Sequence, residues 1–196
     1  FNDKNIRKIY PQADSSKPMY NRVKTYNTLI QYNLLGENVI FMDSDVMILE
    51  NPWDDLAKLN FDIAVTYRFT PNLVPINEGV IYCRSKSEES KRFFAKYIQT
   101  YEKIKNNKII KDTVCTDLER WRGGQLSLNG ICNAGRMITY RDSTENVVFL
   151  PCDKYNRTIY GYSELQSIIN ENSSFLVHAK GNAKKVEQDS GRNIDS

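Results

Sequence analysis

Hydrophobic and polar residues along this chain predict strands separated by helices. Short apolar runs bounded by turn-forming residues indicate buried strands, and apolar residues at three- and four-residue steps indicate helices. The clearest strand-like runs are residues 39–42, 61–67, 80–83, 147–150 and 175–177. Such alternation predicts an α/β fold, with a mainly parallel mixed sheet flanked by helices.

The first predicted helix runs from Met19 to about Leu35, with apolar residues at helical steps. Pro18 lies just ahead of it, where proline is tolerated at a helix start. Gly36 follows the last turn and is a candidate C-cap.

Two later helices are marked by polar residues at their starts. Ser85 or Ser87 caps the longer one, and acidic residues follow in its first turn. Ser163 and Gln166 have the spacing of a capping box that opens the last helix. The apolar stripe of the longer helix comprises Phe93, Phe94, Tyr97, Ile98, Tyr101 and Ile104.

Residues 39–50 form the stretch around which the chain is organised. An apolar run, Val39–Met42, leads into Asp43 and Asp45, and a second run, Val46–Leu49, follows. The first run predicts a strand buried on both faces. Two carboxylates at the end of such a strand require a counter-charge, and open α/β sheets bind ligands at that end. A divalent cation, which can bridge to phosphates, meets this requirement; the alternative is an ordinary pair of aspartates that starts a loop.

The composition is that of a soluble globular domain. The chain has 196 residues, of which 40% are hydrophobic and 26% are charged. The formal net charge of +3 argues against a dedicated nucleic-acid-binding protein. No apolar run approaches the ~18 residues of a membrane span, so we expect a soluble, cytoplasmic protein.

The only histidine of the chain, His178, also follows an apolar run. Together with the aspartates it belongs to a series of motifs whose order resembles that of the retaining GT-A glycosyltransferases. The likeness is to glycogenin-like and lipopolysaccharide galactosyltransferases and to related nucleotide-diphospho-sugar transferases. The motifs are Tyr20-Asn21-Arg22-Val23, Asp43-Ser44-Asp45, Asn77-x-Gly79, Gly124-Gln125, Leu150-Pro151 and His178-x-x-Gly181-x-x-Lys184.

This resemblance implies a Rossmann-like GT-A domain and a metal site. Asp43 and Asp45 match the family's D-x-D motif, and His178 matches its third metal ligand. Carboxylate and imidazole ligands together favour Mn²⁺ over Mg²⁺, which remains an alternative. The implied domain comprises residues 1–183, and residues 184–196 form a polar tail.

The resemblance also implies an activity and a donor site. The expected reaction moves a sugar, with retention, from a nucleotide-diphosphate-sugar, expected to be a UDP-sugar, to a glycan or other hydroxyl acceptor. Glu78 and Gln125 are the candidate catalytic residues. The candidate donor-binding residues, besides the two aspartates, are Arg22, Ser44, Asn77, Gly181 and Lys184.

The chain departs from the family pattern in three places. It has Glu78 where relatives have a small residue, and Gly124 where they commonly have aspartate. Glu78 therefore either faces the donor sugar or an acceptor hydroxyl, or is a solvated loop residue. The segment before Asp43 is short, so either the first nucleotide-binding strand lies outside this sequence or the base is held differently.

Two other classes of protein remain open. A phosphohydrolase of the haloacid-dehalogenase type also places D-x-D after a buried strand, but Val46-Met47 fits its motif poorly. A non-catalytic domain that binds a nucleotide-sugar or a metal would keep the same ligands. Turnover of a nucleotide-sugar distinguishes the enzyme from this domain.

Overall fold

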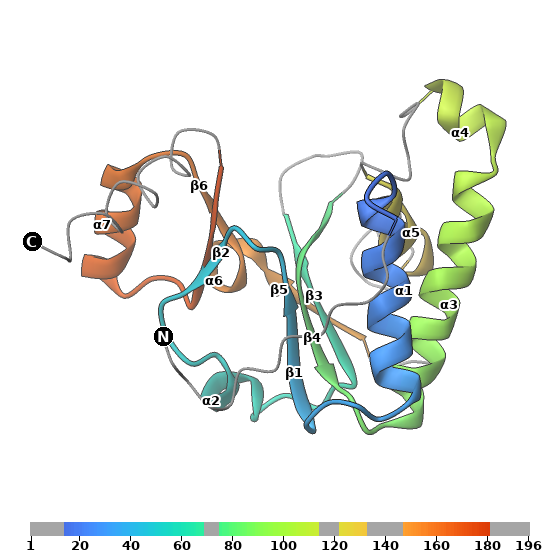
Figure 1. The fold of residues 1–196 in the computed structure, drawn as a ribbon. Coiled ribbons are helices and arrows are strands. Elements are labelled where there is room, and N and C mark those ends of the chain that lie inside the picture. The colour runs from blue at the N-terminus through green and yellow to red at the C-terminus, as the bar shows by residue number, and fades with distance from the viewer. Residues whose placement is uncertain (1–13, 69–74, 114–121, 133–146, 181–196) are drawn as a thin grey trace, which may run out of the picture.

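The computed structural model describes residues 14–68, 75–113, 122–132 and 147–180. Its helices and strands alternate as the sequence predicts (Figure 1). In chain order they are α1 (Pro18–Gln31), β1 (Asn38–Met42), β2 (Val46–Ile48), α2 (Trp53–Leu56), β3 (Ile63–Tyr67), β4 (Ile76–Arg84), α3 (Glu88–Lys105), α4 (Lys108–Thr113), α5 (Gly123–Ile131), β5 (Val147–Pro151), α6 (Cys152–Tyr155), β6 (Arg157–Ile159), α7 (Tyr162–Glu171) and β7 (Leu176–Ala179). No helix within these residues combines the length and apolar character that crossing a membrane requires.

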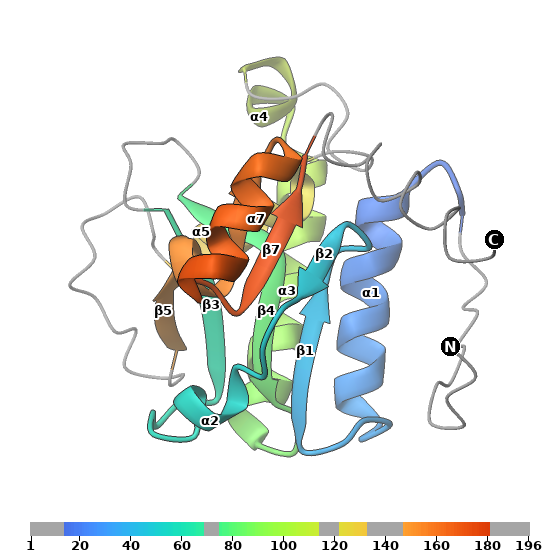
Figure 2. The same ribbon diagram turned by 90° about the vertical axis from the view of Figure 1, so that its left-hand side faces the viewer.

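The described strands form two sheets. The larger has the order β1-β4-β3-β5, and the smaller has the order β2-β7-β6. Figure 2 shows β7, β2 and α7 in front of the larger sheet. The predicted α/β class with a mixed sheet is confirmed.

Parallel pairing is less frequent among these strands than the sequence predicts. The pairs β3·β5 and β6·β7 are parallel, whereas β1·β4, β3·β4 and β2·β7 are antiparallel. The connection between β3 and β4 explains part of this difference. It runs only from Tyr67 to Ile76, which is too short for the helical crossover that parallel neighbours need.

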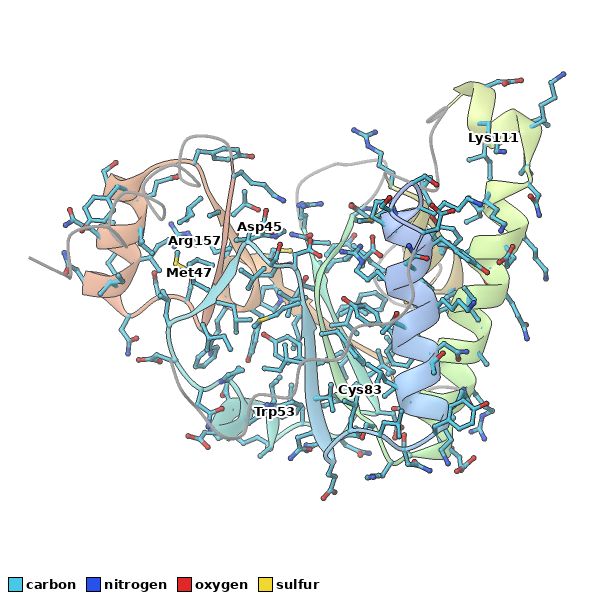
Figure 3. All side chains as sticks on the ribbon, viewed as in Figure 1. Asp45, Met47, Trp53, Cys83, Lys111 and Arg157 are labelled. Carbon is cyan, nitrogen blue, oxygen red and sulfur yellow. The ribbon has the colours of Figure 1, made fainter. Side chains whose placement is uncertain are left out.

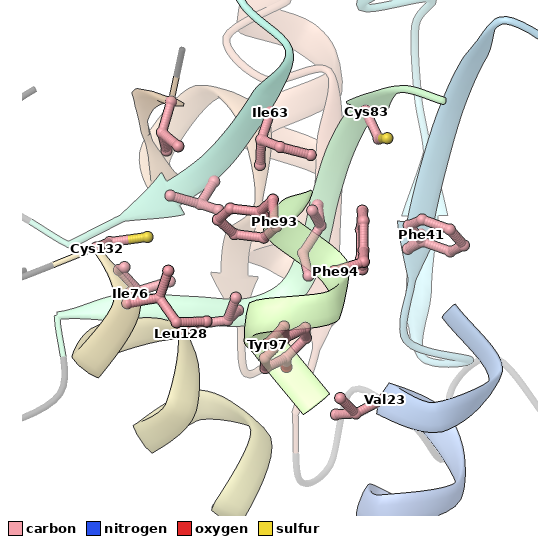
Figure 4. Close-up of a cluster of buried hydrophobic side chains, with 14 of the residues drawn as sticks. Val23, Phe41, Ile63, Ile76, Cys83, Phe93, Phe94, Tyr97, Leu128 and Cys132 are labelled. Atoms are coloured by element: carbon pink, nitrogen blue, oxygen red, sulfur yellow. The ribbon is translucent and has the colours of Figure 1, made fainter. Parts of the chain in front are cut away.

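Helices α1, α3 and α5 cover one face of the larger sheet (Figure 1). Their apolar side chains pack on β3 and β4, whose residues are almost all buried. Figure 4 shows Phe93, Phe94 and Tyr97 of α3 in this core. Burial of each such side chain contributes about 1.5–3 kcal/mol, so the predicted stripe of α3 anchors the helix layer.

A second core lies between the two sheets. It includes Val80 and Tyr82 from β4 and Leu176 from β7. The Tyr82 hydroxyl donates a hydrogen bond to the carbonyl of Tyr155 at 3.0 Å, which satisfies a polar group within this core. This packing fixes the position of β7 relative to the larger sheet.

Of the two predicted caps at Ser85 or Ser87 and at Gly36, the first is found and the second is not. Ser87 is the N-cap of α3 and accepts a hydrogen bond from the backbone N–H of Ser90 at 3.0 Å, which selects it over Ser85. Gly36 is not the C-cap of α1, because the helix ends at Gln31 and Asn33 adopts the left-handed conformation with φ 52°.

The predicted capping box of the last helix is wrong. Helix α7 begins at Tyr162, one residue before Ser163, and its N-cap is Gly161. The backbone N–H of Tyr160 instead donates to Oε2 of Glu164 at 2.7 Å. The carboxylate of Glu164, in the first turn of α7, thus binds the backbone just before the helix, and Ser163 does not act as the N-cap.

Candidate active site at the junction of the two sheets

The stretch 39–50 forms two strands that belong to different sheets. β1 ends at Met42 and lies at one end of the larger sheet as described, so only Phe41 in it is buried. The prediction that this strand is buried on both faces is therefore wrong. Residues 43–45 turn the chain from β1 into β2, and Figure 3 shows Asp45 near the start of β2.

Backbone hydrogen bonds fix this turn between β4 and β7. The N–H of Asp43 donates to the carbonyl of Gly79 at 2.9 Å, and the N–H of Ala179 donates to the carbonyl of Asp45 at 2.9 Å. The N–H of Val46 closes the turn on the carbonyl of Asp43 at 3.2 Å. Both aspartates are thereby held by backbone rather than by a mobile loop.

His178 lies on β7 opposite Val46, and its side chain meets both carboxylates. Its Nε2 is 2.9 Å from Oδ1 of Asp45 and 3.8 Å from Oδ2 of Asp43. One ligand atom from each of these three residues lies within 4.8 Å of the others. The order of motifs in the sequence predicted that these three residues, which are far apart in the chain, would lie together.

The imidazole of His178 is poised to act as a neutral ligand. Burial, and after it the ammonium of Lys180, lower the pKa of His178, against the opposing effect of Asp45 and Asp43. A neutral imidazole is the form that binds metals.

A positive group already contacts two of the three candidate ligands, His178 and Asp45. Nζ of Lys180 is 2.6 Å from Nε2 of His178 and 3.8 Å from Oδ2 of Asp45. The donor set of two carboxylates and one imidazole suits a borderline divalent ion such as Mn²⁺. The residues present therefore fit a divalent cation.

The absence of a side chain at Gly79 leaves the space that the imidazole of His178 occupies. A Cβ at this position would lie 2.6 Å from Cε1 and 2.7 Å from Nδ1 of His178, closer than packed atoms approach. The ring therefore packs directly on the backbone of β4. Any side chain at residue 79 would displace it from the carboxylates.

Arg22 of α1 connects Asp43 with Glu78. Its Nη1 donates to Oδ1 of Asp43, and its Nη2 lies 2.5 Å from Oε1 of Glu78. Burial alone would lower the pKa of Arg22, but the two carboxylates raise it, so the guanidinium stays charged. The ion pairs offset part of the cost of burying these charges.

Glu78 is a buried residue of β4, so the interpretation as a solvated loop carboxylate is wrong. The hydroxyl of Tyr97 donates to its Oε1 at 2.6 Å. Burial, and then the charge of Glu78, raise the pKa of Tyr97 well above its usual range, which keeps the phenol protonated as a donor.

The carboxylate of Glu78 occupies the space beside Gly124. A Cβ at residue 124 would lie 2.5 Å from Cδ and 2.7 Å from Oε2 of Glu78. Two of the three departures from the pattern of the resembling family, Glu78 and Gly124, therefore meet at one point. A carboxylate from β4 fills the space that a side chain at the start of α5 would take.

The remaining candidates, the donor-binding residues and the catalytic candidate Gln125, have varied positions. Asn77 is buried, and its Oδ1 accepts from the N–H of Gly79 at 3.2 Å, which places it beside the imidazole. Gln125 follows Gly124 in the first turn of α5 and is partly buried. Ser44 is exposed at the turn. Gly181 and Lys184, and with them the predicted boundary between domain and tail, lie outside the described residues.

Two site residues, Tyr97 and Lys180, were not assigned roles from the sequence. Tyr97 has the spacing of the apolar stripe, and a periodic pattern does not show where a hydroxyl points. Lys180 had a usable signal, because residues two apart in an extended chain share a face, which places it beside His178.

The fold and this arrangement define a GT-A-like architecture with a candidate metal site, and comparison with solved structures supports the class at the level of fold. A glycosyltransferase involved in the glycosylation of the major capsid of PBCV-1 matches with a TM-score of 0.53 and 11% identity, over 93% of this chain and 80% of its own. No family model and no curated protein matches the sequence.

Two further glycosyltransferase structures are similar at lower scores. GlyE of Streptococcus pneumoniae TIGR4 has a TM-score of 0.46 and 20% identity, over 76% of this chain and 35% of its own. The galactosyltransferase LgtC, in complex with donor and acceptor sugar analogs, has a TM-score of 0.46 and 12% identity, over 88% and 68%. The match to the capsid glycosyltransferase confirms the resemblance stated from the motifs as a likeness of fold.

Proposed function

We propose that this protein transfers a sugar from a nucleotide-diphosphate-sugar to a hydroxyl group of a glycan or other acceptor. The observation that carries the proposal is the meeting of Asp43, Asp45 and His178 within 4.8 Å at the junction of the two sheets. The likeness of fold to a capsid glycosyltransferase supports it. The finer assignments, to a UDP-sugar donor, to Mn²⁺ and to retention of configuration, rest on the order of motifs.

The chain's own residues would divide the work as follows. Asp43, Asp45 and His178 would hold a divalent cation, and Arg22 would keep Asp43 in place. A bound divalent cation would act as a Lewis acid that stabilises negative charge on the departing diphosphate. Lys184 is proposed to contact the same diphosphate, together with Ser44 and Gly181.

Glu78 and Gln125 are proposed to act at the sugar and acceptor side, with Asn77 lining the pocket. The Glu78 side chain contacts Arg22 and Tyr97 through the same oxygen, Oε1. Glu78→Gln keeps the shape of the side chain and removes its charge. A turnover equal to that of the wild type would exclude a catalytic role for this carboxylate.

The test is release of nucleoside diphosphate from a panel of nucleotide-sugars with Mn²⁺ and a glycan acceptor. We expect turnover with at least one donor, loss of activity on chelation, and a product whose anomeric configuration, read by NMR, is that of the donor. Asp45→Asn should lower turnover roughly 100-fold or more, because it removes a cation ligand. The exposed Asp54→Asn is the matched control and should keep full activity.

Binding of a nucleotide-sugar without turnover would instead identify a non-catalytic binding domain. No binding of any nucleotide-sugar with Mn²⁺ would overturn the proposal altogether.

A further inference from the structure

Lys180 contacts the cation site through a side chain that can reach solvent. Its Nζ lies 2.6 Å from Nε2 of His178, and its side chain is 38% exposed, whereas that of His178 is 2% exposed. The imidazole cannot leave without disturbing the core. The lysine side chain can move away into solvent.

The backbone of Lys180 is fixed while its side chain is long. The N–H of Lys180 donates to the carbonyl of Ile159 at 2.8 Å, which continues the pairing of β6 with β7 by one residue. Movement of the ammonium therefore needs only rotations within the four-carbon stem. Such rotations keep it within reach of whatever binds at the junction of the two sheets.

Lys180 and a divalent cation would compete for the same ligand atom. When the proton of the neutral imidazole is on Nδ1, Nε2 offers a single lone pair. Nε2 is also the atom that lies 2.9 Å from Asp45 and 3.8 Å from Asp43. The ammonium and a cation cannot share it, and their like charges repel each other. A cation that binds Nε2 would therefore displace Lys180.

The displaced ammonium would meet an anionic group. A donor diphosphate bound beside the cation would bring negative charge to the same place, and a lysine ammonium is a good point-charge partner for phosphate oxygens. We propose that Lys180 serves two partners in turn, first the imidazole of His178 and then a phosphate oxygen of the donor. This inference rests on the proposed function and adds a residue distinct from Lys184.

Calorimetry on Lys180→Met tests both halves of the proposal, because the affinities for Mn²⁺ and for uridine diphosphate should change in opposite directions. Without nucleotide, the affinity for Mn²⁺ should rise about threefold or more, because a competing positive charge is gone. With Mn²⁺ saturating, the affinity for uridine diphosphate should fall roughly tenfold or more, because a charge-assisted hydrogen bond is lost. Lys86→Met, which removes an exposed lysine whose Nζ is 3.5 Å from the carbonyl of Asn33, is the matched control and should change neither affinity.

The single histidine of the sequence gives an independent readout. In protein whose histidine is labelled with ¹⁵N, Lys180→Met should shift the Nε2 resonance without added metal, and Lys86→Met should not. Zn²⁺, a diamagnetic probe, should then bring the Nε2 resonance of the wild type and of Lys180→Met to similar positions.

Both affinity changes are required. If either affinity of Lys180→Met equals that of the wild type, or if Mn²⁺ affinity falls, the role of Lys180 is overturned while the proposed function stands. A wild-type protein that binds neither Mn²⁺ nor uridine diphosphate would overturn both.

Discussion

Gly124 leaves space that the carboxylate of Glu78 fills. Because this carboxylate also binds Arg22 and Tyr97, a side chain at residue 124 would disturb the network that leads to Asp43. The identity of residue 124 is therefore set by residues from three other elements, α1, β4 and α3.

Gly124→Ala should lower the free energy of unfolding by about 1–3 kcal/mol, the usual cost of overpacking. Gly130→Ala is the control in the same helix, because its Cβ would meet only Cγ2 of Thr100 at 3.7 Å. That control should be neutral or stabilising, by up to about 1 kcal/mol, because alanine is the better helix former. Urea denaturation measures both.

A double-mutant cycle assigns the cost to the carboxylate. In a Glu78→Ala background the obstacle is absent, so Gly124→Ala should cost less than in the wild type. Equal costs in the two backgrounds would show that Glu78 does not occupy this space.

At the scale of the element, Ser87 and Ser163, both candidate helix caps from the sequence, behave differently. Ser87 accepts the hydrogen bond of an N-cap, whereas Ser163 lies inside α7. Ser87→Ala should lower the free energy of unfolding by about 1 kcal/mol. Ser163→Ala should change it by less than about 0.5 kcal/mol. A comparable loss in both variants, measured by thermal or urea unfolding, would contradict the placement of the two helix starts.

Local signals predicted most elements but not how they pair. The stripe of α3 and the apolar runs of β3 and β5 were predicted to within a few residues. An element that is buried on one face or on both has a characteristic spacing of apolar residues. The separation of β1 from β2 was not predictable, because the partner of β2 is β7, far along the chain. The grouping of Asp43, Asp45 and His178 as candidate metal ligands was predicted from the order of motifs. The contact of Tyr97 with Glu78 was not, because it depends on a rotamer.

At the scale of the whole molecule, Asp55 joins segments that are distant in sequence. Its Oδ2 is 2.8 Å from Nζ of Lys154 and accepts a hydrogen bond from the hydroxyl of Tyr155 at 2.5 Å. The hydrogen bonds from Lys154 and then from Tyr155 lower the pKa of Asp55 below its ordinary value of 3.8. Folding is therefore coupled to loss of a proton from this carboxyl group.

The sign of the pH dependence follows from the lowered pKa. The stabilisation is fully present above the unfolded-state pKa and is lost as the pH falls through the lower folded-state pKa. We expect the difference in unfolding free energy between the wild type and Asp55→Asn to be constant at neutral pH and to shrink below about pH 4. Asp54→Asn is the neighbouring control. A difference that did not change with pH would show that Asp55 is not coupled in this way.

The position of the candidate ligands on two sheets has a mechanical consequence. Asp43 follows the last residue of β1 in the larger sheet, whereas His178 belongs to β7 in the smaller one, so their separation depends on how the sheets are set against each other. The core between the sheets holds that setting through Val80, Tyr82 and Leu176. A shortened side chain such as Leu176→Ala would let the sheets slide and change the spacing of the ligands without touching any of them. Cation affinity would then report on the alignment of the two sheets, and a bound ion would resist sliding of one sheet against the other.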